Sequence, residues 1–186
     1  MTGAGPEAAA RQTAAAAPPP VVVVMGVSGA GKTTLGRMLA ARHAFRFLDG
    51  DDFHPADNVA KMRAGIPLDD SDRAPWLQCL SDILSQAGEP TVLACSALKA
   101  CYREALAARC PQAFFVHLAG SRQVIGGRLA ARSGHYMPPS LLASQMEALE
   151  APRDTDTSVT LDCGRPLEEL CDAVLLALAA RRAGAA

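Results

Sequence analysis

A short glycine-rich run follows an apolar stretch near the N-terminus. The run from Gly26 to Thr33 reads GVSGAGKT and comes directly after VVVVM. Small residues at these positions let successive backbone N–H groups turn inward around phosphate oxygens, and the helix that follows presents its positive N-terminal end. Lys32 adds a mobile positive charge, and the Thr33 hydroxyl can ligate Mg²⁺. The spacing predicts a cradle for Mg²⁺ and a nucleoside triphosphate, formed by Gly26, Val27, Ser28, Gly29, Ala30, Gly31, Lys32, Thr33 and Thr34.

An acidic segment follows the second apolar stretch. The sequence from Asp49 to Pro55 reads DGDDFHP, with three carboxylates within four residues. Such carboxylates repel one another unless a cation or hydroxyl donors share the site. Mg²⁺ and a polyhydroxylated substrate would supply both, whereas a solvated acidic turn is the structural alternative. Between Asp49 and Arg73 the chain has seven acidic and three basic residues. A nucleoside monophosphate would call for several arginines, so this lining suits a small polyhydroxylated acid better.

Basic residues occur in two pairs with a spacing of four. Lys99 and Arg103 follow the third apolar stretch and share one helical face, from which both can point toward a crevice. Arg128 and Arg132 precede the hinge residue Gly134. A mobile flap bearing these arginines would bring positive charge to the γ-phosphoryl oxygens and exclude water. The structural alternatives are an ordinary basic helix start for the first pair and a solvent-exposed helix end for the second.

Five apolar segments have strand character, and helical patterns separate them. Strands that alternate with helices need crossover connections, which build a parallel sheet with helices on both faces. Ligands of such sheets bind beyond the carboxyl ends of the strands, so we expect the segments that carry chemistry to converge there. The predicted strands are 21–25, 45–48, 91–95, 113–118 and 158–161. One helix is predicted to start at the glycine-rich run, and the others are 73–86, 100–108, 121–131, 139–149 and 166–180.

Composition limits the class of protein. The chain has 186 residues and a net charge of −1, which predicts one domain without the broad basic face that nucleic acid demands. Residues 12–31 carry no charge, but three consecutive prolines exclude a membrane span there. Residues 1–20, rich in Ala and Pro, are predicted to be a disordered leader before a domain at 21–186. The six cysteines form no C-x-x-C pair and no secretory segment precedes the domain, which favours the cytoplasm.

Several sequence pieces occur together in a characteristic order. Beside the two segments above they are Asn58 with Lys61 and Met62, GIPL at 65–68, DRAPWL at 72–77, CSALK at 95–99, Tyr102 with Arg103, and RSGHYM at 132–137. With these pieces, the chain from 21 to 180 resembles the gluconokinases, a small P-loop kinase family related to shikimate kinase. The phosphate-binding loop is common to many enzymes, whereas the H-P, D-R-x-P-W-L and C-S-A-L-K pieces in this order are far more specific.

The resemblance implies a fold, an activity and a set of partners. The fold would be a single-domain α/β P-loop kinase, similar to nucleoside monophosphate kinases, with a five-stranded parallel sheet. The reaction would transfer the γ-phosphoryl group of ATP, with Mg²⁺, to the 6-hydroxyl of D-gluconate. The product, 6-phosphogluconate, would enter the pentose phosphate pathway. A homodimer is also implied, whereas the expectation that the protein binds neither nucleic acid nor a membrane comes from its composition.

The resemblance also implies roles for individual residues. Lys32 and Thr33 would serve the phosphates and Mg²⁺, Asp49 would hold the water shell of the metal, and Asp51 would orient or deprotonate the acceptor hydroxyl. A substrate segment at about 50–90 and a lid at about 128–140 are expected. The remaining assignments are His54 and Arg73 on gluconate, Lys99 and Arg103 beside the phosphoryl path, Arg128 and Arg132 in the lid, and His135 on the substrate side.

Other functions stay open from the sequence. Another small-molecule kinase of the same fold, acting on shikimate or a nucleoside monophosphate, would share most of these features. A non-catalytic nucleotide-binding switch is a second alternative. The chain has no D-x-x-G and no N-K-x-D sequence for reading guanine, and a switch would leave the acidic segment without a purpose. A catalytically inactive relative is a third alternative.

Overall fold

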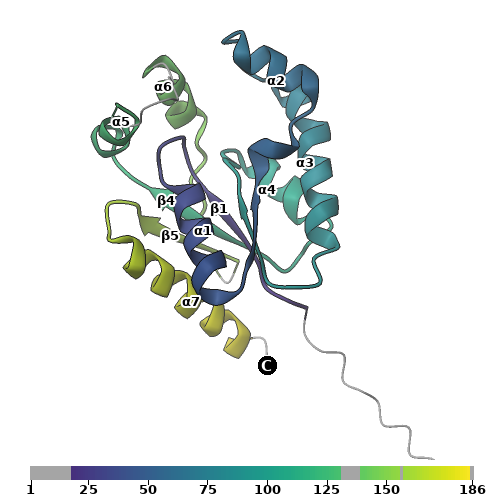
Figure 1. The fold of residues 1–186 in the computed structure, drawn as a ribbon, viewed down its shortest axis with the longest axis vertical. Coiled ribbons are helices and arrows are strands. Elements are labelled where there is room, and N and C mark those ends of the chain that lie inside the picture. Colours follow the sequence, from purple (N-terminus) through teal and green to yellow (C-terminus); the bar gives the residue numbers. More distant parts are fainter. Residues whose placement is uncertain (1–17, 131–138, 156, 185–186) are drawn as a thin grey trace, which may run out of the picture.

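A parallel sheet of five strands forms the centre of the molecule. The computed structural model describes residues 18–130, 139–155 and 157–184. The strand order is β2-β3-β1-β4-β5, and every pairing is parallel (Figure 1). The α/β fold class predicted from the alternation of strands and helices is confirmed. The strands are β1 (Val21–Met25), β2 (Arg46–Asp49), β3 (Thr91–Ala94), β4 (Ala113–Ala119) and β5 (Ser158–Asp162).

Helices cover both faces of this sheet because alternate side chains of each strand point to opposite sides. On β1, Val22 and Val24 pack with α1 (Lys32–His43) and α7 (Leu167–Gly184). Val21, Val23 and Met25 pack instead with α3 (Asp70–Ser85) and α4 (Ala100–Ala107). All five side chains of β1 are fully buried, which explains why this strand is apolar without interruption.

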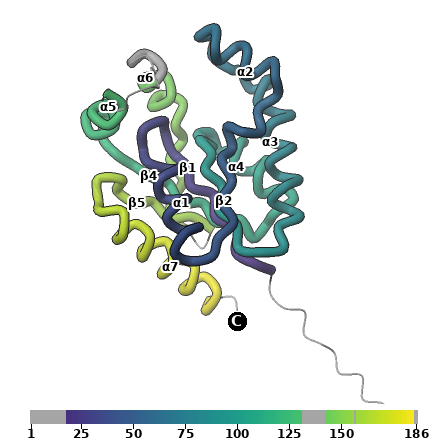
Figure 2. Tube along the Cα trace, in the orientation of Figure 1, coloured from purple at the N-terminus to yellow at the C-terminus, as the bar shows by residue number. Residues whose placement is uncertain are grey.

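Three further helices lie around the edge of the sheet where the strands end. They are α2 (Ala56–Arg63), α5 (Arg122–Ala130) and α6 (Pro139–Ala148). Figure 2 shows α5 and α6 together at one side of this edge and α2 at the other. Neither α2 nor the short 3-10 helix η1 (Gly50–Phe53) that precedes it was predicted from the sequence. No helix in the described part of the chain is long and apolar enough to cross a membrane.

Candidate active site

The glycine-rich run forms an open loop between β1 and α1. Gly26, Gly29 and Gly31 have φ angles of 136°, 83° and 105°, a region that favours glycine. A Cβ atom on Gly26 would lie 2.8 Å from the Leu118 carbonyl oxygen. Helix α1 has neither a side-chain cap nor an acidic residue in its first turn. The N-terminal dipole of α1 is therefore left for an anionic ligand, as the sequence predicts.

The acidic segment after β2 lies against this loop. The Thr33 hydroxyl donates to Oδ2 of Asp49 at 3.2 Å, and the backbone N–H of Asp51 donates to Oδ1 of Asp49 at 3.3 Å. Hydroxyl and carboxylate oxygens are the ligands that Mg²⁺ accepts, often through bound water. The residue types at this contact therefore fit a magnesium ion. The contact joins the acidic segment that contains Asp51 to the first turn of α1.

His54 follows η1 and is held in one orientation by its neighbours. Its ring stacks on Trp76, with centroids 4.1 Å apart and an interplanar angle of 15°. The Trp76 Nε1–H donates to the Gly50 carbonyl oxygen at 2.8 Å, which ties α3 to η1. Asn58 Nδ2 lies 3.4 Å from His54 Nδ1 and 2.8 Å from the Asp72 carbonyl oxygen.

These contacts set the protonation of His54. Burial lowers the pKa of His54 from 6.5, the charge of Asp51 partly opposes this shift, and Arg73 adds to it. The imidazole is therefore neutral at pH 7. Because an amide nitrogen only donates, His54 Nδ1 is the acceptor and Nε2 carries the proton. His54 is thus a hydrogen-bond donor through Nε2. The buried Asn58, which sequence reasoning named only as part of a motif, selects this tautomer.

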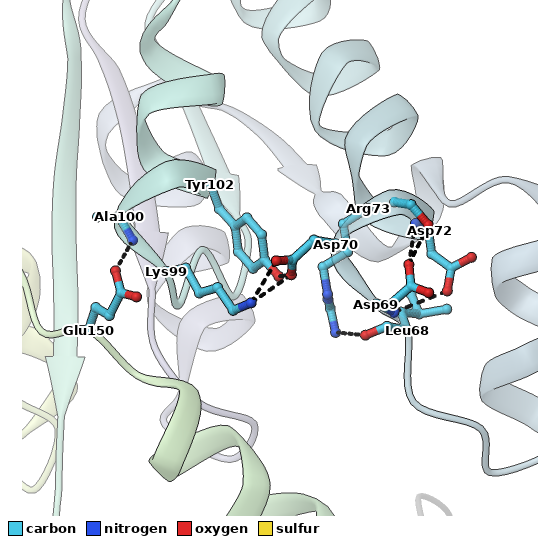
Figure 3. A network of polar contacts seen from close by, with 10 residues as sticks. Leu68, Asp69, Asp70, Asp72, Arg73, Lys99, Ala100, Tyr102 and Glu150 are labelled. Atoms are coloured by element: carbon cyan, nitrogen blue, oxygen red, sulfur yellow. Dashed lines mark hydrogen bonds and ion pairs between the residues drawn. The ribbon is translucent and has the colours of Figure 1, made fainter.

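The start of α3 is an ordered cluster of charged residues (Figure 3). Asp69 and Asp72 form a capping box, in which each side chain accepts from the backbone N–H of the other residue. Lys61 Nζ donates to Oδ1 of Asp72 at 2.6 Å, and this hydrogen bond lowers the pKa of Asp72. Arg73 Nη2 donates to the Leu68 carbonyl oxygen at 3.4 Å. Part of the acidic run thus stabilises the start of α3 rather than binding a ligand.

Two cations lie close to the ring of Tyr102. The Arg73 guanidinium carbon is 5.7 Å from the centroid of the Tyr102 ring, and Lys99 Nζ is 5.5 Å from it. Lys99 Nζ also contacts both carboxylate oxygens of Asp70, and the Tyr102 hydroxyl donates to one of them (Figure 3). The structure therefore brings Lys99 and Arg73 from separate segments to one place. Sequence reasoning missed Asp70 and Tyr102 as their partners.

Arg103 is used within its own loop. Its Nη1 donates to the carbonyl oxygens of Ala97 at 3.2 Å and Leu98 at 3.1 Å. Ala97 has a φ of 43°, so the loop between β3 and α4 takes a backbone turn that a non-glycine residue rarely adopts. Burial lowers the pKa of Arg103. The geometry gives Arg103 a role in holding this loop, and its contact with a substrate stays a prediction.

Arg128 faces the other side of the phosphate-binding loop. Its Nη2 donates to the Cys163 carbonyl oxygen at 2.7 Å, and Nη1 lies 3.5 Å from the Ala30 carbonyl oxygen. These groups border a cavity of about 300 Å³, which Arg165 and Leu167 also line. Cys163 and Arg165 follow β5, so this segment also lies beyond the carboxyl end of a strand, where ligand-binding segments were expected to converge. Arg132 and His135 lie outside the described residues.

The segment from α6 to Glu150 contacts both sides of the site. The Ser28 backbone N–H donates to Oε1 of Gln145 at 2.7 Å. The Ala100 N–H donates to Oε2 of Glu150 at 2.6 Å, and the Glu150 N–H donates to the Leu98 carbonyl oxygen at 2.9 Å. Sequence reasoning missed Gln145 and Glu150. No motif in the sequence includes either residue: Gln145 is a single polar residue on α6, and Glu150 follows the end of that helix.

Comparison with known proteins identifies the family. Residues 21–152 match a family profile described as "AAA domain". The chain is 43% identical over 166 residues to the thermosensitive gluconokinase of Escherichia coli, which covers 86% of this chain and 89% of that protein. This chain belongs to the gluconokinase family. The resemblance drawn from the sequence is confirmed.

Solved structures agree with the gluconokinase assignment. The crystal structure of a gluconokinase from Sinorhizobium meliloti aligns with a TM-score of 0.80 and 44% identity, over 87% of this chain and 92% of that one. Shikimate kinase from Aquifex aeolicus aligns with a TM-score of 0.54 and 17% identity, over 88% of this chain and 99% of that one. The second likeness concerns the fold alone, and it confirms that the fold is of the P-loop kinase type.

Proposed function

We propose that this protein transfers the γ-phosphoryl group of ATP to the 6-hydroxyl of D-gluconate, giving 6-phospho-D-gluconate and ADP. The observation that carries this proposal is the contact between Thr33 and Asp49, which puts the acidic segment directly against the phosphate-binding loop. A phosphoryl donor and a polyhydroxylated acceptor would therefore meet at Asp51. The relatives with 43% and 44% identity support gluconate as that acceptor.

On the donor side, the loop from Gly26 to Thr34 would hold the phosphates through backbone N–H groups, and Lys32 would neutralise charge on the β- and γ-phosphoryl oxygens. Thr33 and Asp49 would hold Mg²⁺, which spreads the charge of the transferring group when bound. Arg128 would contact the nucleotide from the far side of the loop, beside the cavity near Cys163.

On the acceptor side, Asp51 would orient the 6-hydroxyl and take its proton as the phosphoryl group arrives. His54 would donate from Nε2 to a substrate oxygen, because Asn58 occupies its Nδ1. Arg73 and Lys99 would bind the gluconate carboxylate, since both cations lie beside Tyr102 within reach of the same region. The acceptor would thus need a carboxylate to accept its hydroxyl proton and cations to bind its carboxylate. These two needs would explain why carboxylates and cations occur together on the acceptor side.

Further features of the proposal concern the whole protein. We propose a kinase domain from residue 21 onward, with a substrate segment at about 50–90 and a lid at about 128–140 that includes Arg132 and His135. We also propose that residues 1–20 form a leader before this domain. The protein would be a homodimer, would be located in the cytoplasm and would supply the pentose phosphate pathway. Size-exclusion chromatography with light scattering tests the homodimer directly.

The function is tested by measuring ADP release from Mg·ATP with a panel of acceptors. The panel contains gluconate, other aldonates, glycerate, shikimate and nucleoside monophosphates. We expect release with gluconate and little with the rest. Release with shikimate or AMP instead would favour another small-molecule kinase of the same fold. ATP binding without release for any acceptor would favour a nucleotide-binding switch.

A further inference from the structure

Gln145 has a defined orientation beside the phosphate-binding loop. The Ser28 backbone N–H donates to its Oε1 at 2.7 Å across 117 positions of sequence. Because a backbone N–H can only donate, the oxygen of the carboxamide must face Ser28, and Nε2 with its two hydrogens must face elsewhere. Nε2 has no hydrogen bond to any other residue that the structure describes. Among the described residues, the two hydrogens of Nε2 are therefore without an acceptor beside the loop.

Ser28 lies at the end of the loop where the γ-phosphate would sit. Its neighbour Val27 accepts a hydrogen bond from Lys32 Nζ through its carbonyl oxygen, at 3.1 Å. The lysine of this motif reaches the β- and γ-phosphates. A side chain that is anchored on Ser28 is thus close to the position that the terminal phosphoryl group would take.

The backbone around Gln145 is fixed at two points. Leu142, one turn earlier on α6, is 5% exposed and belongs to the same buried core cluster as Ile125. Glu150, just after the helix, is bound to the N–H of Ala100 and the carbonyl oxygen of Leu98. A residue between these two anchors keeps its position with little loss of conformational freedom on ligand binding, which is what a preorganised donor requires.

We propose that Gln145 is a catalytic residue whose Nε2 donates a hydrogen bond to an oxygen of the transferring γ-phosphoryl group. This inference rests on the proposed function. No bond to Gln145 forms or breaks. The γ-phosphorus breaks its bond to the β–γ bridging oxygen of ATP, which stays on the β-phosphate of ADP, and bonds to the acceptor oxygen, whose proton passes to Asp51. Gln145 thereby adds a neutral donor to the positive groups that Lys32 and the loop supply, where charge develops on the equatorial oxygens.

Two substitutions separate this role from a purely structural one. Gln145→Ala removes both the contact with Ser28 and the donors. Gln145→Glu keeps an acceptor for the Ser28 N–H but replaces the donors by a charged oxygen. We expect both variants to lower kcat by about 100-fold, with the Glu variant at least as impaired as the Ala variant. Gln123→Glu on α5, an exposed residue, is the matched control for the added charge and should behave as the wild type.

Nucleotide binding provides a second readout that does not depend on the acceptor. Gln145→Glu should weaken binding of a non-hydrolysable Mg·ATP analogue about tenfold relative to Mg·ADP, because only the analogue has a γ-phosphate. Circular dichroism checks that each variant is folded. A Glu variant with near-normal kcat beside an impaired Ala variant would mean that Gln145 only supports the loop. Wild-type kinetics in both variants would also overturn the proposal. So would an equal loss of affinity for the Mg·ATP analogue and for Mg·ADP in Gln145→Glu.

If the wild type releases no ADP with gluconate, the proposed function fails while the nucleotide titration still tests Gln145. If gluconate is phosphorylated and the Gln145 variants are normal, only the further inference fails. The two claims are therefore distinguishable in one set of experiments.

Discussion

Lys99 Nζ lies 2.7 Å and 2.9 Å from the two carboxylate oxygens of Asp70. Asp70 is the first residue of α3, and Lys99 is the residue that precedes α4. The hydrogen bond between them raises the pKa of Lys99 and lowers the pKa of Asp70, so both groups are charged at neutral pH. The cation that we assign to the gluconate carboxylate thus already has a carboxylate partner within the protein.

If Lys99 binds the gluconate carboxylate as proposed, Asp70 competes with the substrate for this cation. Asp70→Asn should lower the KM for gluconate by up to about fivefold, a small effect because the pair is partly exposed to solvent. The KM for ATP should not change. Steady-state kinetics at varied gluconate check this, with Asp82→Asn, which removes an ion pair with Arg109 far along α3, as the control. A higher KM for gluconate would show instead that Asp70 itself binds the substrate.

Removal of Asn58 should impair acceptor binding through His54. In Asn58→Ala, His54 Nδ1 loses its donor and the imidazole is free to take the other tautomer. We expect the KM for gluconate to rise about tenfold and the KM for ATP to stay constant. Asp57→Ala, at an exposed position of the same helix, is the control. If both KM values rise together, Asn58 supports the fold in general rather than His54.

The periodicity of the sequence predicted the sheet well because buried parallel strands are apolar throughout. The predicted range 21–25 coincides with β1. The strands β3, β4 and β5 each differ from their predicted ranges by one residue at the C-terminal end, and β2 is shifted by one residue at both ends. Helix α2 was missed because it is short and exposed, with Asn58 as its one buried residue. Its position depends on contacts with Asp72 and His54, which lie in other segments.

The site was predictable where one segment carries the chemistry. The phosphate-binding loop was predictable because its motif lies in one continuous run. Asp49 was predictable because it lies at the end of a predicted strand. The pairings of Lys99 with Asp70 and of Ser28 with Gln145 join residues 29 and 117 positions apart. Such pairs depend on how helices pack in three dimensions, and no local spacing in the sequence encodes them.

His117 on β4 should make the stability of the fold depend on pH. It is 3% exposed, and neither ring nitrogen has a hydrogen-bond partner in the described part of the chain. Burial lowers its pKa from 6.5, Arg103 adds to the shift and Asp154 opposes it. A lowered pKa in the folded state means that stability is fully present above 6.5 and is lost as the pH falls through the folded value.

The melting temperature should therefore fall between about pH 7 and about pH 5, and His117→Phe should reduce that fall. The pKa of His54 is also lowered, so His54 contributes to the fall in the same direction. Some dependence of the melting temperature on pH should therefore remain in His117→Phe. His43→Gln, at an exposed position, is the control for loss of an imidazole. Thermal unfolding followed by circular dichroism measures the effect, and an unchanged slope in His117→Phe would contradict it.

Asp49→Asn should raise the Mg²⁺ concentration required for half-maximal activity by about tenfold or more, because the site loses a negative charge next to Thr33. The fold should persist, since an asparagine oxygen still accepts from the Thr33 hydroxyl. Mg²⁺ titration at saturating ATP and gluconate measures the change. Asp52→Asn, at an exposed neighbouring position, should have a normal Mg²⁺ requirement. Equal effects of the two substitutions would argue against a specific metal ligand.

The most direct test of the central claim is to identify the product by NMR after incubation with Mg·ATP and ¹³C-labelled gluconate. We predict phosphorus coupling at carbon 6 of gluconate for the wild type and a large loss of this signal for Asp51→Asn with ATP binding retained. Phosphorylation at another carbon would contradict the assigned geometry. The absence of any phosphorylated gluconate from folded, ATP-binding protein would contradict the proposed activity itself.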